Sequence, residues 1–238
     1  MKHLWKGFAA LALLGATGVL TAPGCVDAEA PFFIIGVKAQ TCDATSIDGA
    51  NLGSGALDVR YNCNYYAILE LGNQLVKRGD ETKLQIETSR ISVTSVDVQI
   101  FAEDGVTPVQ NSAGNAQFSF PVTGFIDPAS GTEPGRGLAE ALLIDPGTAF
   151  ALANSGGGKV IARVVARGRT LGGDDLKTRP FDFPIDVCLG CLCFAPTDDA
   201  CVNSEAGPED DCLINQDFQF DCRWIGRNCN EPAICGVF

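Results

Sequence analysis

Cysteine is distributed very unevenly along this chain, and its distribution constrains the fold more than any other feature of the sequence. Of the 11 cysteines, two lie within residues 26–187 and eight are crowded into residues 188–238. This density is typical of a disulfide scaffold. A segment so short usually depends on covalent staples, because it cannot bury a large apolar core. We therefore expect a first domain over residues 31–187 and a small disulfide-rich C-terminal module over residues 188–238.

The remaining cysteine, Cys25, follows a segment typical of an export signal. Lys2 and Lys6 precede a mostly apolar run that extends from Phe8 to Leu20. This run is too short to cross a bilayer, since a spanning helix needs about 20 residues. Residues 1–24 are therefore predicted to be a signal peptide.

The residues before Cys25, Thr21-Ala22-Pro23-Gly24, resemble the lipobox of bacterial lipoproteins, in which small residues precede a cysteine that is lipidated. The resemblance implies that Cys25 carries lipid and that residues 25–30 form a lipidated N-terminal linker. Two or three acyl chains would anchor the protein stably to a membrane. The alternative is ordinary signal-peptidase cleavage after Ala28-Glu29-Ala30, a small-x-small pattern.

Lipidation of Cys25 leaves an even number of cysteines, and we expect all of them to form disulfides. These are Cys42, Cys63, Cys188, Cys191, Cys193, Cys201, Cys212, Cys222, Cys229 and Cys235. Cys42 and Cys63 bracket a polar, glycine-rich loop over Asp43–Gly55, and we expect them to bond to each other because no nearer partner exists. The connectivity of the eight C-terminal cysteines stays open. Zinc binding by Cys188-x2-Cys191 is the alternative, which the oxidising environment of an exported protein disfavours.

The only histidine, His3, lies in the predicted signal peptide. The exported chain would therefore have no histidine for a catalytic triad or a metal site. No serine lies in the Gly-x-Ser-x-Gly pattern of a nucleophile elbow. We assign no catalytic, cofactor-binding or metal-binding residue, and we expect a protein that is not an enzyme and uses no cofactor. The remaining enzymatic alternative is a glycan-processing enzyme, which needs only two carboxylates.

Residues 31–187 show the period-two hydrophobic alternation of an all-β domain. Tyr65, Ala67, Leu69 and Leu71 would share one apolar strand face. Further on, Val160, Ala162, Val164 and Ala166 alternate with Ile161, Arg163, Val165, Arg167 and Arg169, and we expect the first of these two sets to be buried.

Several other segments are expected to be strands, and turn signals separate them. They are Phe32–Val37, two pieces within residues 84–101, Gln117–Phe125, and a hairpin of Lys159–Thr170 with Asp175–Val187. Pro121 suggests an edge or a bend in its strand. Leu138–Ile144 fits a strand or a helix equally well. This number of short strands predicts an immunoglobulin-like β-sandwich, followed by the disulfide-rich module.

The remaining motifs have ordinary structural explanations. Arg78-Gly79-Asp80 spells an integrin-binding tripeptide but is expected to be a turn. Ser155–Lys159 lacks the residues of a phosphate-binding loop. The acidic segment Glu205–Asp211 is expected to be a solvated loop, with weak calcium binding as the alternative. Trp224 is expected to fill a small core in the C-terminal module.

Charge and pattern together suggest where such a protein works. The net charge of −12 disfavours nucleic-acid binding, which requires a basic surface. The lipobox-like leader, the β-rich body, the segment Phe183–Cys191 (FPIDVCLGC) and the cysteine-rich tail resemble uncharacterised lipoproteins of myxobacteria. That resemblance implies an outer-envelope location, on the periplasmic face or the cell surface, and no activity.

We therefore expect a lipid-anchored cell-envelope protein that has a non-enzymatic binding or structural role. Its partners would be the membrane, through the lipid anchor, and a protein or glycan at the cell surface. A subunit that associates with itself through an open strand edge is the structural alternative.

Overall fold

The computed structural model describes residues 30–39, 49–79, 85–194, 216–221 and 235. The chain is mostly β within these residues, as the alternating pattern predicts. The expected signal peptide, Cys25, the acidic segment and Trp224 lie outside them. No helix of the described residues is long and apolar enough to cross a membrane.

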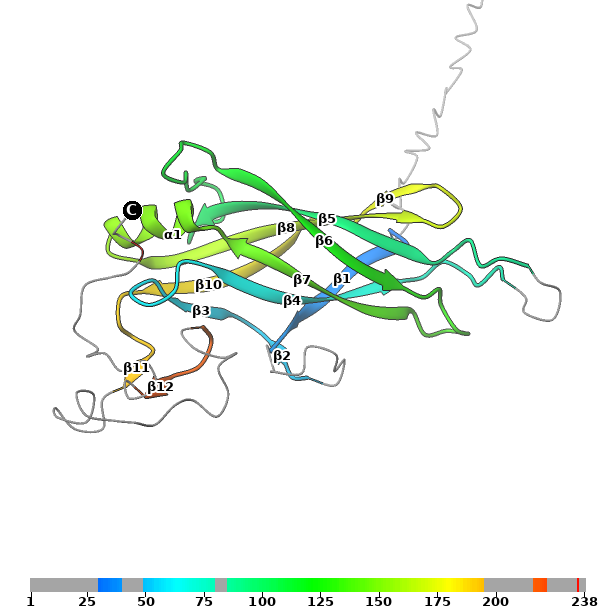
Figure 1. Ribbon diagram of the computed structural model, residues 1–238, viewed down its shortest axis with the longest axis horizontal. Helices are drawn as coiled ribbons and strands as arrows, with labels where there is room; N and C mark the ends of the chain where they lie inside the picture. Colours follow the sequence, from blue (N-terminus) through cyan, green and yellow to red (C-terminus); the bar gives the residue numbers. More distant parts are fainter. Residues whose placement is uncertain (1–29, 40–48, 80–84, 195–215, 222–234, 236–238) are drawn as a thin grey trace, which may run out of the picture.

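Two sheets make up most of the described chain (Figure 1). The four-stranded sheet has the order β2 (Asn51–Leu52), β1 (Phe32–Lys38), β4 (Tyr65–Asn73) and β7 (Gly135–Ile144). The six-stranded sheet has the order β3 (Gly55–Asp58), β10 (Phe181–Cys188), β8 (Gly158–Thr170), β5 (Ile91–Ala102) and β6 (Gln117–Ile126), and β9 (Asp175–Lys177) also pairs with β8.

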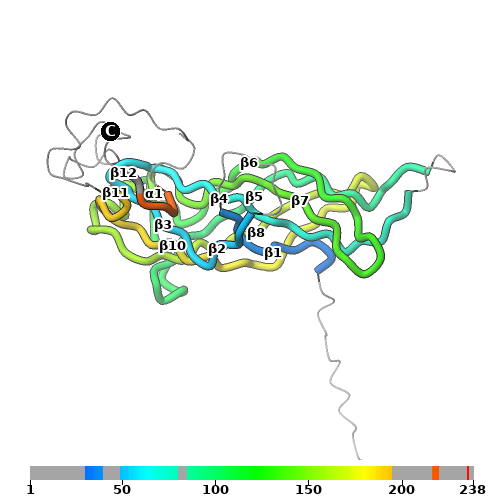
Figure 2. The backbone as a smooth tube through the Cα atoms, turned by 90° about the horizontal axis from the view of Figure 1, so that it is seen from below, coloured from blue at the N-terminus to red at the C-terminus, as the bar shows by residue number. Residues whose placement is uncertain are grey.

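Three smaller elements lie at one end of the molecule. They are the helix α1 (Pro146–Asn154) and the parallel pair β11 (Cys193–Phe194) and β12 (Phe220–Asp221) (Figures 1 and 2). The β8–β9 turn lies toward the opposite end. Asp145 caps α1, because its carboxylate accepts a hydrogen bond from Thr148 N at 2.9 Å, and Pro146 fits the first helical turn.

The hydrophobic core lies between the two sheets, because buried side chains of both belong to one cluster. Both predicted faces are confirmed. Tyr65, Ala67, Leu69 and Leu71 of β4 are buried, as are Val160, Ala162, Val164 and Ala166 of β8. The arginines that alternate with the β8 set lie on the outer face, where Arg163 forms two 2.7 Å hydrogen bonds with Asp182 of β10.

The predicted hairpin is also present, with one interruption. β8 pairs with β9 directly across the turn and then with β10. Gly173 has φ of +102° in that turn, a conformation that favours glycine. Between β9 and β10, Thr178 keeps the ladder intact, because its hydroxyl accepts from Ala166 N and its own N–H donates to Ala166 O.

The structure resolves the ambiguous segment Leu138–Ile144 as part of strand β7, and α1 follows it. β6 is the edge strand that Pro121 suggested, and Pro121 lies opposite the irregularity between Val93 and Ser95 of β5. The strand form of Leu138–Ile144 follows from its pairing with β4, which a short apolar pattern does not specify.

The prediction of a first strand piece near Ile86 is wrong. β5 begins only at Ile91, and Ile86 is 76% exposed. The cause is Glu87, whose carboxylate accepts hydrogen bonds from the backbone N–H groups of Arg78, Gly79 and Ser89. These backbone N–H groups therefore donate to a side chain and cannot pair with a neighbouring strand.

The predicted Cys42–Cys63 disulfide is also wrong, because Cys63 bonds to Cys235 across a sequence separation of 172. Cys235 is 1% exposed and belongs to the main core cluster. Cys42 lies outside the described residues. The prediction failed because it ranked partners by distance along the chain, whereas the fold brings Cys235 next to the start of β4. The Asp43–Gly55 loop contains β2 within its described part.

Candidate functional site

The two sheets leave an open seam along one side of the molecule. β2 pairs with β1 only at Val37 and Lys38. Among the described residues, Phe32–Gly36 therefore has a strand neighbour on the β4 side alone. Likewise β3 pairs with β10 only over Ile185–Cys188, so Phe181–Pro184 has β8 as its one described neighbour. In each sheet, therefore, one strand has an edge that is unpaired among the described residues over at least half of its length.

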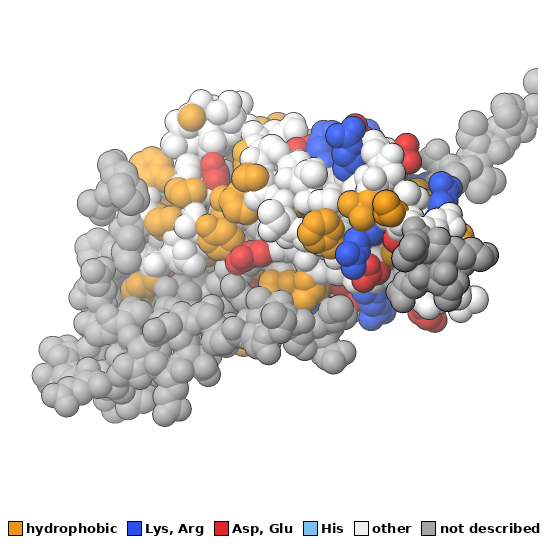
Figure 3. Space-filling model, turned by 45° about the vertical axis from the view of Figure 1, so that its right-hand side comes forward, with side chains coloured by type: hydrophobic (Ala, Val, Ile, Leu, Met, Phe, Trp, Pro, Cys, Tyr) orange, Lys and Arg blue, Asp and Glu red, His pale blue; other side chains and the backbone are white. Residues whose placement is uncertain are grey.

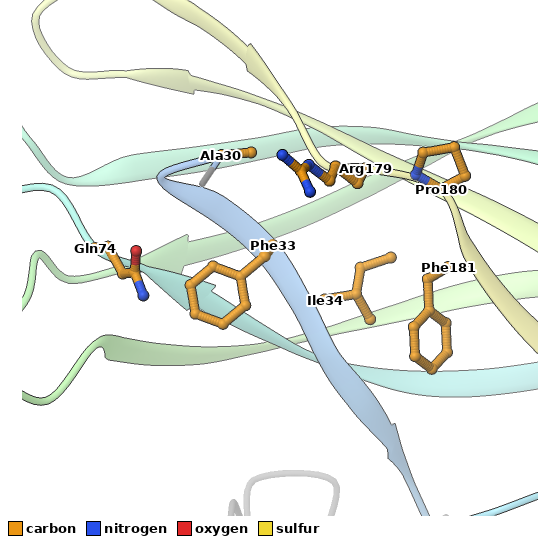
Figure 4. Close-up of a pocket in the computed structure, with 7 residues that line it drawn as sticks. All are labelled: Ala30, Phe33, Ile34, Gln74, Arg179, Pro180 and Phe181. Atoms are coloured by element: carbon orange, nitrogen blue, oxygen red, sulfur yellow. The ribbon is translucent and has the colours of Figure 1, made fainter. Parts of the chain in front are cut away.

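A pocket of about 330 Å³ joins these two unpaired edges (Figure 4). It is lined by Ala30, Phe33, Ile34, Gln74, Arg179, Pro180 and Phe181. Figure 4 shows Ile34 on the side of β1 that faces Pro180 and Phe181, with Phe33 on the other side of the ribbon. The Phe33 ring covers Gly72 of β4, where a Cβ atom would overlap it. Gly72 therefore allows the aromatic wall of the pocket to lie flat against the sheet.

The chemistry of the pocket suits an apolar group on an extended chain. Its walls are aromatic, aliphatic and proline carbons, and Arg179 and Gln74 are its polar members. Phe33, Ile34 and Phe181 are only partly buried, so the pocket opens to solvent. An unpaired strand edge offers backbone hydrogen bonds, and an adjacent apolar pocket selects side chains at alternate positions.

A second hollow, of about 550 Å³, contains two carboxylates and so bears on the glycan-processing alternative. Asp127 is engaged by Arg90 at 2.6 Å. Desolvation raises the pKa of Glu87, but the hydrogen bonds from Gly79, Ser89 and Arg78 outweigh it and leave that pKa lowered. A glycosidase general acid needs a raised pKa, so Glu87 does not have the character of that acid.

Hydrophobic side chains do not merge into one continuous apolar area on the face shown in Figure 3. Some gather toward one half, while basic and acidic side chains lie beside one another in the other half. Phe125 is 61% exposed, and the guanidinium carbon of Arg90 lies 5.9 Å from its ring centre. Apolar and charged side chains are thus mixed on this face.

A partly buried pair, Tyr65 and Asp217, holds the described part of the C-terminal tail against β3 and β4. We call this pair the tail clamp. The Tyr65 hydroxyl donates to both oxygens of Asp217, at 2.8 and 3.0 Å, and Ala56 N donates to Asp217 at 2.8 Å. Burial raises the pKa of Asp217, although these donors act to lower it. Burial and the nearby Asp217 charge both raise the pKa of Tyr65.

Two of the predicted disulfide cysteines, Cys188 and Cys191, bond to each other at the end of β10. Asp58, which is fully buried, lies close to both cysteines, and we call these three residues the Asp58 site. One of the Asp58 carboxylate oxygens and the two sulfurs lie within 4.8 Å of one another. The sequence pattern missed Asp58, because an aspartate at the end of a short strand carries no signal of what packs over it.

The other sequence candidates have mixed outcomes. Cys193 is disulfide-bonded, while Cys25, Cys42, Cys201, Cys212, Cys222 and Cys229 lie outside the described residues. Arg78 and Gly79 bind Glu87 through their backbone N–H groups, and Asp80 lies outside the described residues. The glycines at 156–158 all have positive φ and connect α1 to β8.

No known protein-family model matches this chain, and no curated protein is significantly similar to it. The seam, the tail clamp and the Asp58 site are therefore defined by the residues of this chain alone.

Proposed function

We propose that this chain is an exported, lipid-anchored envelope protein without enzymatic activity, which binds an extended peptide segment of a partner protein. The open seam between β1 and β10 carries the binding part of this proposal. A partner strand would pair with the free edge at Phe32–Gly36 and place an apolar side chain in the pocket. The Cys25 anchor, and with it the envelope location of a myxobacterium-like lipoprotein, is supported by the sequence.

We also propose that the two sheets form an immunoglobulin-like β-sandwich and that the cysteine-rich tail is a disulfide-rich module fastened to it. The strand order supports the first point. The strands β1, β4 and β7 correspond to A, B and E of that fold, and β10, β8 and β5 correspond to G, F and C. β3 runs parallel to β10, as a switched continuation of the first strand would.

The test of peptide binding is selection from a displayed library on the folded, soluble exported chain. We expect enriched peptides to carry apolar residues at alternate positions. Ile34→Glu should weaken their binding at least tenfold, because it places a charge in the pocket. Val106→Glu is the matched control, since Val106 is 75% exposed and lies outside the seam.

Hydrogen exchange provides the second measurement and does not depend on a variant. Bound peptide should slow the exchange of backbone amides within residues 32–36. Failure to enrich any peptide, or equal binding by both variants, would contradict the proposal. Concentration-dependent dimers that Ile34→Glu abolishes would favour self-association through the same edge.

Mass spectrometry of the exported protein tests the anchor separately. The expected N-terminus is a diacylated or triacylated Cys25. An unmodified N-terminus at Pro31 would show cleavage after Ala28-Glu29-Ala30 and would contradict the lipid anchor.

A further inference from the structure

The Cys188–Cys191 disulfide differs from Cys63–Cys235 in accessibility. Cys191 is exposed and Cys188 is partly exposed, whereas Cys63 is partly exposed and Cys235 is 1% exposed. The site also lies next to β11, toward the opposite end of the molecule from the β8–β9 turn (Figure 1). A thiolate from solvent therefore has freer access to Cys191 than to Cys235, which belongs to the core.

The loop that carries the two cysteines is held in place by groups other than the disulfide. The Asp58 carboxylate accepts hydrogen bonds from Gly190 N at 2.7 Å and from Leu192 N at 3.1 Å. Val59 N donates to Cys188 O at 2.9 Å. Gly190 has φ of +87°, which suits a glycine in so tight a loop. Opening the disulfide would therefore leave the loop in its present position, with both sulfurs still close together.

Asp58 also has the position of a proton acceptor. It is fully buried, and one of its carboxylate oxygens lies within 4.8 Å of both sulfurs. In the reduced state it would face two thiols at close range. A thiol must lose its proton before it can attack a disulfide, and the only carboxylate grouped with these sulfurs among the described residues is Asp58.

We propose that Cys188 and Cys191 form a thiol–disulfide exchange site that passes two electrons to disulfides of other envelope proteins, with Asp58 as its proton acceptor. In the reduced state the Cys191 thiolate attacks the substrate disulfide. One substrate thiolate leaves and takes up, through solvent, the proton that Cys191 lost on ionising, and a mixed disulfide forms on Cys191. Asp58 then takes the proton of Cys188, whose thiolate attacks the Cys191 sulfur.

This second attack restores the Cys188–Cys191 disulfide and releases the other substrate thiolate, which receives the proton from Asp58. The substrate disulfide gains two electrons and two protons, and the two cysteines lose them. A dithiol protein of the envelope regenerates the reduced state by the reverse exchange. The envelope location of the substrates rests on the proposed function, but the site does not involve the peptide-binding seam, so the experiments below do not depend on peptide binding.

The first experiment measures which disulfide opens first. The native full chain is exposed to limiting dithiothreitol, quenched in acid, alkylated and mapped by peptide mass spectrometry. Cys188 and Cys191 should be labelled at least tenfold faster than Cys63 and Cys235. Equal rates, or slower opening of Cys188–Cys191, would overturn the proposal and leave this disulfide as a structural staple.

The second experiment follows the reduced protein with oxidised glutathione as the probe. Wild type should release both glutathione molecules, whereas Cys188→Ser should retain one on Cys191. Asp58→Asn should slow release of the second glutathione at least tenfold at about pH 6, and the deficit should vanish near about pH 9, where a thiol ionises unaided. If Asp58→Asn released the second glutathione equally slowly at both pH values, Asp58 would only position the loop and would not accept a proton. If wild type released glutathione no faster than Cys188→Ser, the exchange proposal would be refuted.

Discussion

At the scale of single residues, two aspartates on this protein have pKa values shifted in opposite directions by their surroundings. Burial raises the pKa of Asp217 in the tail clamp. Hydrogen bonds from Arg163 lower the pKa of Asp182 on the outer face of the six-stranded sheet. The two groups should therefore make opposite contributions to the pH dependence of stability.

Replacement of each aspartate by asparagine should separate the two contributions. Folded Asp217 binds its proton more tightly than the unfolded chain does, so wild type should gain stability relative to Asp217→Asn as the pH falls from neutral toward about 4. Asp182 stabilises the folded state only while it is charged, so wild type should lose stability relative to Asp182→Asn below about pH 4. Urea unfolding across this range measures both differences, and changes of the same sign would contradict the assignment.

Gly55 is the residue on which the close fit of the tail clamp depends. A Cβ at this position would overlap the hydroxyl end of Tyr65, a side chain that is itself fully buried. Gly55→Ala should therefore destabilise the protein by about 1–3 kcal/mol, the usual cost of overpacking. Gly53→Ala is the matched control, because no atom lies within 4 Å of its added methyl group. Equal thermal midpoints for the two variants would show that the Tyr65–Asp217 pair can move aside.

At the scale of secondary-structure elements, β8 is the strand on which the larger sheet is assembled. It pairs with β5 along most of its length on one side, and on the other side with β10 over residues 158–164 and with β9 over residues 167–169. Its two faces have different environments, since Val164 is fully buried and the next residue, Val165, is only partly buried.

These adjacent valines provide a direct test of the strand's orientation. Val164→Ala should cost about 2 kcal/mol of unfolding free energy, because it leaves a cavity between the sheets. Val165→Ala should cost less than about 1 kcal/mol, because solvent can fill the space on the outer face. Both variants keep the same β-branched-to-alanine change, so strand propensity cancels in the comparison. A larger loss for Val165→Ala in chemical denaturation would mean that the assigned register is wrong.

At the scale of the whole molecule, the Cys63–Cys235 disulfide ties the two cysteine regions of the sequence together. It joins the start of β4 to a residue of the core cluster that is 172 positions further along the chain. The Cys188–Cys191 disulfide spans three positions. In the loop-entropy model a crosslink stabilises more as its loop lengthens.

The two disulfides should therefore differ in their effect on global stability. Replacement of Cys63 and Cys235 by alanine together should lower the unfolding free energy by about 2–5 kcal/mol. Replacement of Cys188 and Cys191 together should cost about 2 kcal/mol or less, because the loop they close is short. Denaturant unfolding of the two double variants measures the difference. The reverse order would show that the long crosslink constrains little of the unfolded chain.

The sequence determined the β-rich class, the buried faces of β4 and β8, the β8–β10 hairpin and the edge position of β6. Each of these depends on local alternation or on a single proline, which act over a few residues and can be read along the chain. The same alternation failed near Ile86, where the Glu87 side chain binds the backbone donors that a strand would use.

Only the tertiary structure decided how distant parts of the chain meet. The Cys63–Cys235 bond, the Tyr65–Asp217 clamp and Asp58 beneath the Cys188–Cys191 disulfide all join residues more than 100 positions apart. The seam exists because β2 and β3 each cover only half of a neighbouring strand. Hydrophobic period indicates which face of a strand is buried, but it carries no information on where one strand ends along its neighbour. That choice is made by packing between the sheets, and it created both of the proposed sites.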